Sequence, residues 1–352
     1  MLKISPAIIA GIRAAKTAND LQQYLQNAIE LEHATIPPYL TAMFSLKSNT
    51  NREIWDIIHG VVIEEMLHMT IASNILNALG GTPQINNASF IPNYPGPLPM
   101  NINEGLVVGL EKYSKTQVKN VFMEIEEPED PIDFPTTMAV AADEPAFSTI
   151  GQFYAAIKTQ IEALPYENMP GDASKQVTSS FYSAEELFPI ITKTDALNAI
   201  DIIVEQGEGT ATSPLDPEGG YAHYYSFEEL YVGRRLVKND NVPEGYSFTG
   251  DPIPYSEDDV WNIWPNTKAE DLAAGSEERR RADEFNFYYS KLLNGLHVTF
   301  NGQPSFLDNT IGLMYDVKLA GEKLCATPYP GKAGVYIGPP FQFVPIPLPE
   351  NA

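Results

Sequence analysis

The sequence predicts an all-α protein built on a four-helix bundle, with a long crossover connection and extra C-terminal helices. Two long amphipathic segments, residues 17–47 and 51–79, are joined by the short polar turn 47–51, as expected of a helical hairpin. An irregular crossover, 82–192, which is Pro- and Asn-rich over 82–135, separates this hairpin from the next bundle helices. Acidic and histidine side chains recur within otherwise apolar helical faces, which is typical of bundles with polar sites in their core.

Composition limits the function classes. The chain has 352 residues, 43% of them hydrophobic, and a net charge of −24, which argues against partners such as nucleic acid or an anionic membrane. It has no apolar run of about 18 residues, so no membrane span is expected. Pro6 and Arg13 interrupt the apolar N-terminus, and Cys325 is the single cysteine. A cytoplasmic location is therefore expected, and a thiolate-rich metal site is excluded.

The first helix is expected to run from about residue 17 to 47, with Asn19 or Asp20 as its cap. Glu32 lies on its apolar face, whose other members are Leu25, Ala28, Ile29, Ile36 and Tyr39. Pro37-Pro38 predicts a kink or a loosened turn just beyond Glu32. His33 points about 100° away from Glu32 and is expected to pack or to support the site from outside. Tyr39 is either a core residue or a hydrogen-bond donor to the site.

The second helix is expected to run from about residue 51 to 79, with Asn49 or Thr50 as its cap and Gly80-Gly81 as its end. Glu65-x-x-His68 places a carboxylate and an imidazole one turn apart on an apolar face. Glu32 and Glu65 each lie about 14 residues, or about 21 Å, from the turn. They are therefore level in an antiparallel hairpin. Two buried carboxylates and a histidine on adjacent helices indicate a metal site, because unpaired buried charges are costly.

The rest of the chain supplies the other helices. The crossover 82–192 contains turn clusters at 94–99 and 126–131, a short helix and one or two extended pieces within 102–113 and 116–124, and a longer helix at about 148–164. The third and fourth bundle helices are expected at 194–208 and 221–237, which closes a bundle domain at 15–237. Residues 238–352 form a C-terminal extension with two helices, at about 277–300 and 307–325, packed on the bundle.

Two further ligands are expected from the last two bundle helices, Glu205 on the third and His223 on the fourth. Each lies about one turn from the connection between these helices. Glu208 is either a further ligand or a group that supports the ligands, and the stripe containing both glutamates could equally be a solvated face. Gly220 stands where a second Glu-x-x-His would need its glutamate. Carboxylates with imidazoles favour iron or manganese.

The residues 29–40, the Glu65/His68 motif and the segment Val204 to Gly209 resemble ferritin-like proteins. More closely, they resemble the ferritin-like domain of the iminophenylpyruvate dimer synthase type, found in enzymes that couple two indole-derived imines in violacein and indolocarbazole biosynthesis. The resemblance implies a ferritin-like bundle with a di-metal centre and oxidative chemistry on dioxygen, peroxide or an imine-type small molecule. A second copy of the chain, in a homo-oligomer, is a further candidate partner. The three-Glu, two-His set also resembles manganese catalases, so peroxide dismutation and a non-catalytic bundle stay open.

Overall fold

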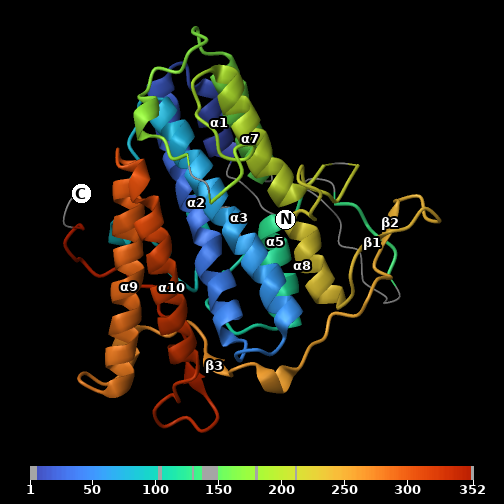
Figure 1. Cartoon of the computed structure of the whole chain (residues 1–352), viewed down its shortest axis with the longest axis vertical. Coiled ribbons are helices and arrows are strands. Elements are labelled where there is room, and N and C mark those ends of the chain that lie inside the picture. Colours follow the sequence, from blue (N-terminus) through green and yellow to red (C-terminus); the bar gives the residue numbers. More distant parts are fainter. Residues whose placement is uncertain are drawn as a thin grey trace.

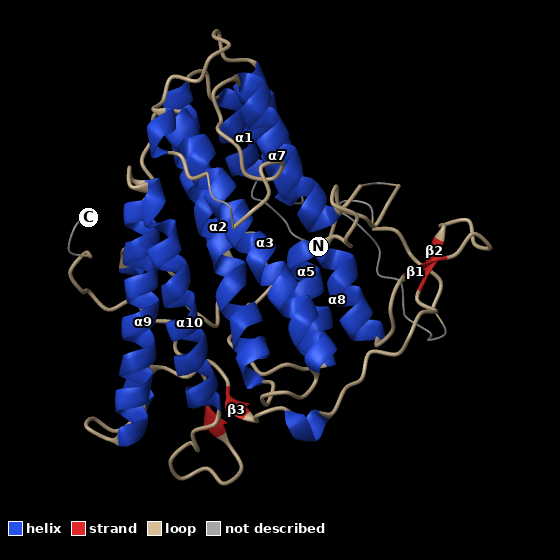
Figure 2. Cartoon of the chain, in the orientation of Figure 1, coloured by secondary structure: helices blue, strands red, loops and turns tan. Residues whose placement is uncertain are grey.

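The computed structural model describes residues 6–101, 105–128, 131–136, 150–178, 181–210 and 212–349. Within these ranges the fold is mostly helical (Figures 1 and 2). The helices are α1 (Pro6–Ala14), α2 (Ala18–Ser45), α3 (Arg52–Ala78), α4 (Lys115–Gln117), the π-helical turn η3 (Val118–Phe122), α5 (Met123–Glu126), α6 (Ile150–Glu162), α7 (Lys193–Glu208), α8 (His223–Val232), α9 (Glu277–Phe300) and α10 (Leu307–Cys325). Short 3₁₀ turns occur at 88–90, 99–101, 173–175, 257–259, 269–271 and 304–306.

The expected hairpin of α2 and α3 is confirmed and forms the centre of the molecule (Figure 1). Its caps differ from the prediction. Thr17 caps α2, and Asp20 closes a capping box with it instead of capping the helix itself. Asn51, in the left-handed conformation, precedes α3 without a side-chain cap. Gly80, at φ 77°, ends α3 as expected.

The helix α2 continues through Pro37 and Pro38. Proline has no backbone N–H, so Pro38 leaves the carbonyl of Ala34 without its helical donor. The Tyr94 hydroxyl takes that place and donates to Ala34 O at 2.7 Å. A residue of the crossover therefore completes the hydrogen bonding of α2 one turn before the prolines.

The third bundle helix is broken into two pieces and lies within the segment that the sequence assigned to the crossover. The run α4–η3–α5 begins beside the end of α2, where Tyr113 N donates to Ser45 Oγ, and Glu126 at its end meets Tyr39. The second piece, α6, continues along α2, because Tyr154 contacts Glu32. The expected helix at 148–164 is thus half of a bundle helix. Its first two residues lie outside the described ranges.

The fourth bundle helix is also broken, and its pieces are the segments predicted as the third and fourth helices. In α7, Gln206 contacts His68 of α3. In α8, His223 contacts Glu64 of α3, and beyond its end Arg235 contacts Glu53. As the residue numbers rise from 206 to 235 in this part of the chain, the contacted residues of α3 fall from 68 to 53. The helices α7 and α8 therefore lie end to end and run antiparallel to α3. The prediction that they are separate neighbouring bundle helices was wrong.

The C-terminal helices α9 and α10 pack against one another and against the outer side of α2 and α3 (Figure 1). The strands are two residues long: β1 (Val237–Lys238) pairs antiparallel with β2 (Tyr246–Ser247), and β3 (Ile263–Trp264) pairs parallel with β4 (Tyr336–Ile337). The extended tail docks on α9, where Val344 N donates to Ser290 Oγ. Among the described residues, no helix is long and apolar enough to cross a membrane.

Candidate metal centre

Three carboxylates and two imidazoles meet at the level where the third and fourth bundle helices are broken. They are Glu32 of α2, Glu65 and His68 of α3, Glu126 at the end of α5 and His223 at the start of α8, and none is more than 5% exposed. One ligand atom each of Glu65, His68 and His223 lies within 4.8 Å of the other two. The structure therefore brings together four of the six residues that the sequence singled out, with Glu126 as a fifth member.

Each carboxylate has one oxygen at a hydroxyl group and the other facing a histidine nitrogen. Tyr154 donates to Glu32 Oε1, and Tyr39 donates to Glu126 Oε1. The Thr35 hydroxyl lies 3.0 Å from Glu65 Oε2 and also 2.8 Å from the carbonyl of Glu32. Tyr39 is thus both a core residue and a donor to the site. These contacts fix the orientation of the three carboxylates and leave one oxygen of each directed toward the imidazoles.

Both histidines present Nδ1 to these oxygens. His223 Nδ1 lies 2.9 Å from Glu65 Oε1 and 3.5 Å from Glu126 Oε2, yet it makes no hydrogen bond of acceptable geometry. His68 Nδ1 lies 3.8 Å from Glu32 Oε2, beyond hydrogen-bond distance. A buried nitrogen surrounded by carboxylate oxygens without a hydrogen bond is the arrangement that metal ligands adopt around a cation.

The opposite ring nitrogens fix the tautomers. The Gln206 amide nitrogen points at Glu186 and Glu218, so its oxygen faces His68 Nε2 at 2.8 Å and must accept a proton from it. His223 Nε2 lies 2.8 Å from a carboxylate oxygen of Glu64 and donates to it in the same way. In the neutral rings, both Nδ1 atoms therefore carry the lone pair that a metal requires, and their outer hydrogen bonds orient the rings as in known metal sites.

The electrostatics of the cluster also call for a cation. Burial, followed by the charge of Glu65, raises the pKa of Glu32 well above its usual value. Burial would lower the pKa of His223, but its contacts with Glu126, Glu64 and Glu65 raise it well above the usual value. Burial and the neighbouring His223 lower the pKa of His68 to about 3. Within the described part of the chain, the ion-pair partners of the three carboxylates are histidines, with no lysine or arginine. The residues fit divalent metal ions, whose charge would offset the buried carboxylates.

The two glutamates of α7 have different positions. Glu208, the last residue of α7, lines a small cavity at the cluster, and its Oε1 accepts from the backbone N–H of Gly151 at 2.7 Å. Glu205 is half-buried and is not among the residues that line this cavity. On this helix it is Gln206 that contacts a histidine of the cluster. The structure therefore does not bring Glu205 to the site, because the α7 face that meets the cluster contains residues 203, 204, 207 and 208.

Sequence reasoning missed Glu126. It was assigned to a turn cluster because Pro128 and Pro131 follow it closely. The signal that identifies it is helical spacing: Val118, Phe122 and Glu126 are separated by four residues each, and all three are buried. The same pattern had been used to place Glu32 on an apolar face.

The cavity at the cluster is small. It measures about 20 Å³ and is lined by Glu32, Glu65, His68, Glu126 and residues of α6 and α7. That is enough for one molecule of the size of water. The cavity therefore has room for one water-sized molecule beside the carboxylates and does not hold a larger one as it stands.

The fold and this site define a ferritin-like carboxylate bundle, in which acidic and histidine side chains of four helix positions meet in the core. Comparison with known proteins agrees: the ferritin-like family model matches residues 25–232, and the chain belongs to that family. A crystal structure of a ferritin-like protein from Caulobacter vibrioides is 26% identical, with a TM-score of 0.57, over 88% of this chain and 96% of that one. Dichlorochromopyrrolate synthase from Lentzea aerocolonigenes is 22% identical over 93% of this chain, which spans only 36% of the length of that enzyme.

Proposed function

We propose that this protein is a di-metal oxidoreductase that uses iron or manganese and reacts with dioxygen or peroxide. The observation that carries the proposal is the convergence of the three carboxylate oxygens of Glu32, Glu65 and Glu126 on the Nδ1 atoms of His68 and His223. One ligand atom of Glu65 lies within 4.8 Å of ligand atoms of both His68 and His223, so Glu65 would help to hold metal together with either histidine. Iron or manganese held there would supply redox chemistry, giving electrons to dioxygen or passing electrons from one peroxide molecule to another.

The residues of the chain have distinct tasks in this proposal. Tyr39 and Tyr154 hold Glu126 and Glu32 in position, and Glu64 and Gln206 hold the imidazoles. Burial of all five ligands excludes bulk water. Reduction of an oxygen molecule consumes protons, and Glu208 is a further carboxylate at the cavity that can hold and transfer one.

The size of the cavity favours small oxidants over an imine-type organic substrate at the ions themselves. Dichlorochromopyrrolate synthase is a much longer enzyme, so its reaction is not carried over as a whole. Peroxide dismutation without an organic substrate is the second candidate, since the same small cavity suffices for it. A bundle that binds metal without catalysis is the third.

Elemental analysis tests the proposal. The protein is incubated with Fe²⁺ or Mn²⁺, freed of loose metal and compared with the double variant Glu65→Ala/His68→Ala. A matched control is Glu53→Ala/His59→Ala, which changes the same residue types on the same helix outside the cluster. About two ions per chain are expected in the parent and the control, and a loss in the Glu65/His68 variant. Equal metal content in all three proteins would refute the site.

A second measurement separates the candidate reactions. Oxygen uptake by the Fe²⁺-loaded protein supports the oxidase, whereas oxygen release from hydrogen peroxide by the Mn²⁺-loaded protein supports dismutation. Metal binding with neither reaction would leave the non-catalytic bundle.

A further inference from the structure

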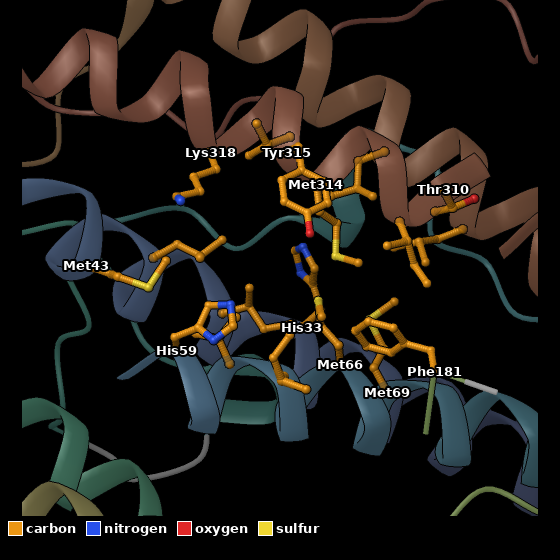
Figure 3. Close-up of a pocket in the computed structure, with 18 of the residues that line it drawn as sticks. His33, Met43, His59, Met66, Met69, Phe181, Thr310, Met314, Tyr315 and Lys318 are labelled. Carbon is orange, nitrogen blue, oxygen red and sulfur yellow. The ribbon is translucent and has the colours of Figure 1, made fainter. Parts of the chain in front are cut away.

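A second and much larger cavity lies on the other side of α2 and α3 from the metal centre. It measures about 550 Å³, which is within the range of small-molecule sites and far above the voids of ordinary cores. His33, Met66 and Met69 reach it from α2 and α3, and Met314, Tyr315 and Lys318 face them from α10 (Figure 3). His33, Met66 and Met69 each directly follow a residue of the metal cluster in sequence. The helices α2 and α3 therefore form a wall between the chamber and the metal centre.

The lining is apolar and adaptable. Four methionines, Met43, Met66, Met69 and Met314, contribute flexible side chains, and leucines of α9 cover the far wall. The rim includes Phe181 and Tyr315, which are 45% and 66% exposed, so the cavity opens to the surface there. Of the 28 lining residues, 12 come from α9 and α10, which lie beyond the residues that the family model matches. The C-terminal extension thus creates a chamber that the bundle alone does not have.

One polar atom inside this chamber is left without a partner. Among the described lining residues, His33 Nδ1 is the buried side-chain nitrogen or oxygen that makes no hydrogen bond. His33 Nε2 lies 2.6 Å from the Tyr289 hydroxyl, and the described residues provide no other acceptor for the proton of this hydroxyl. Tyr289 therefore donates to Nε2, which places the ring proton of the neutral imidazole on Nδ1. His33 therefore offers the chamber a buried N–H donor that no described protein group uses.

We propose that this chamber binds a neutral, largely apolar small molecule that carries one hydrogen-bond acceptor, such as an aromatic ketone, with the acceptor placed against His33 Nδ1–H. An unpaired buried donor is costly, and an acceptor on the ligand would satisfy it. The walls select the apolar body, and His33 selects the position of its acceptor. This site is independent of the metal centre and of the reaction proposed there.

A pair of naphthalene probes tests the proposal. One is 6-propionyl-2-(dimethylamino)naphthalene, an aromatic ketone whose fluorescence shifts to the blue in apolar surroundings, and the other is 2-ethylnaphthalene, which lacks the carbonyl. The variant Met314→Trp fills the chamber, and Leu319→Trp places the same residue at a 63% exposed position of the same helix outside the cavity. The ketone is expected to bind the parent and Leu319→Trp with a blue shift, and Met314→Trp at least tenfold more weakly.

The variant His33→Phe tests the donor, because it keeps a ring and removes Nδ1–H. It is expected to weaken binding of the ketone about three- to tenfold and to leave 2-ethylnaphthalene unchanged, with folding checked by circular dichroism. Binding of the ketone should persist in Glu65→Ala/His68→Ala, which distinguishes this site from the metal centre. Absence of ketone binding to the parent, or equal binding to Met314→Trp, would overturn the chamber. Equal losses for both probes in His33→Phe would overturn the assigned acceptor.

Discussion

Replacement of Glu126 by glutamine should affect the metal-loaded protein much more than the metal-free protein, and this difference tests the cluster directly. Glu65 Oε1 and Glu126 Oε2 lie 2.9 and 3.5 Å from the same nitrogen, His223 Nδ1, so the two oxygens are at most about 6.4 Å apart, the sum of the two distances. At an effective dielectric constant of about 20, two like charges at that distance repel by about 2.5 kcal/mol. Removing one charge relieves that repulsion in the metal-free protein, but it also removes the attraction between Glu126 Oε2 and the His223 ring, whose Nδ1 lies 3.5 Å away, so the two effects oppose one another.

In the metal-loaded protein the same change removes a ligand. Loss of a residue that hydrogen-bonds to a metal ligand typically costs 10- to 100-fold in metal affinity, which is about 1.4–2.7 kcal/mol. Loss of a direct ligand should cost at least as much. We therefore expect Glu126→Gln to shift the Tm of the metal-free protein by no more than about 2 °C and to lower that of the loaded protein by more. The assay is thermal unfolding with and without Mn²⁺, together with a chelator competition for affinity.

Glu205→Gln is the matched control, because Glu205 was the ligand expected from sequence and the structure does not bring it to the site. It should leave both unfolding curves and the metal affinity unchanged. If Glu126→Gln bound metal as tightly as the parent, or if Glu205→Gln lost metal, the arrangement of the third and fourth bundle helices deduced above would be wrong.

Two other predictions concern Glu64 and Glu228. Glu64→Ala removes the acceptor of His223 Nε2–H and should weaken metal binding 10- to 100-fold, whereas Glu64→Gln keeps an acceptor oxygen and should retain most of the affinity. If both variants lost metal equally to a chelator, this role of Glu64 would be contradicted. Burial, with a smaller effect of Asp133, raises the pKa of Glu228 from 4.5 to about 8. Folding therefore favours the protonated form of Glu228. The stability that this form confers is full below pH 4.5 and is lost as the pH rises toward 8. Glu228→Gln should therefore remove this pH dependence and stabilise the protein at pH 8 by about 2 kcal/mol after allowance for solvent screening. Urea unfolding at pH 5 and pH 8 measures this. The assignment would be refuted if the free energy of unfolding changed between the two pH values as much in the variant as in the parent.

Local sequence determined the hairpin that holds half of the metal cluster. The spacing of apolar residues and the Gly80-Gly81 end define α2 and α3, and chain geometry alone makes Glu32 and Glu65 level. Their contacts in the structure follow from these facts, because a short turn leaves two adjacent helices one way to pack. The helices at 277–300 and 307–325 were predictable for the same reason: each has its own periodic apolar face.

Only the tertiary structure decided how the remaining segments fill the other two bundle positions. Sequence periodicity identifies a helix but does not say whether two helices lie side by side or end to end. Residues 126–131 were therefore taken as a turn and Glu208 as the end of a whole helix, so Glu126 was left out of the site while Glu205 was included. Long-range packing against α2 and α3 joins the pieces, since Tyr39 and His68 select their partners Glu126 and Gln206 from segments more than 80 residues away. The chamber at His33 depends on the same kind of information, because its two walls come from opposite ends of the chain.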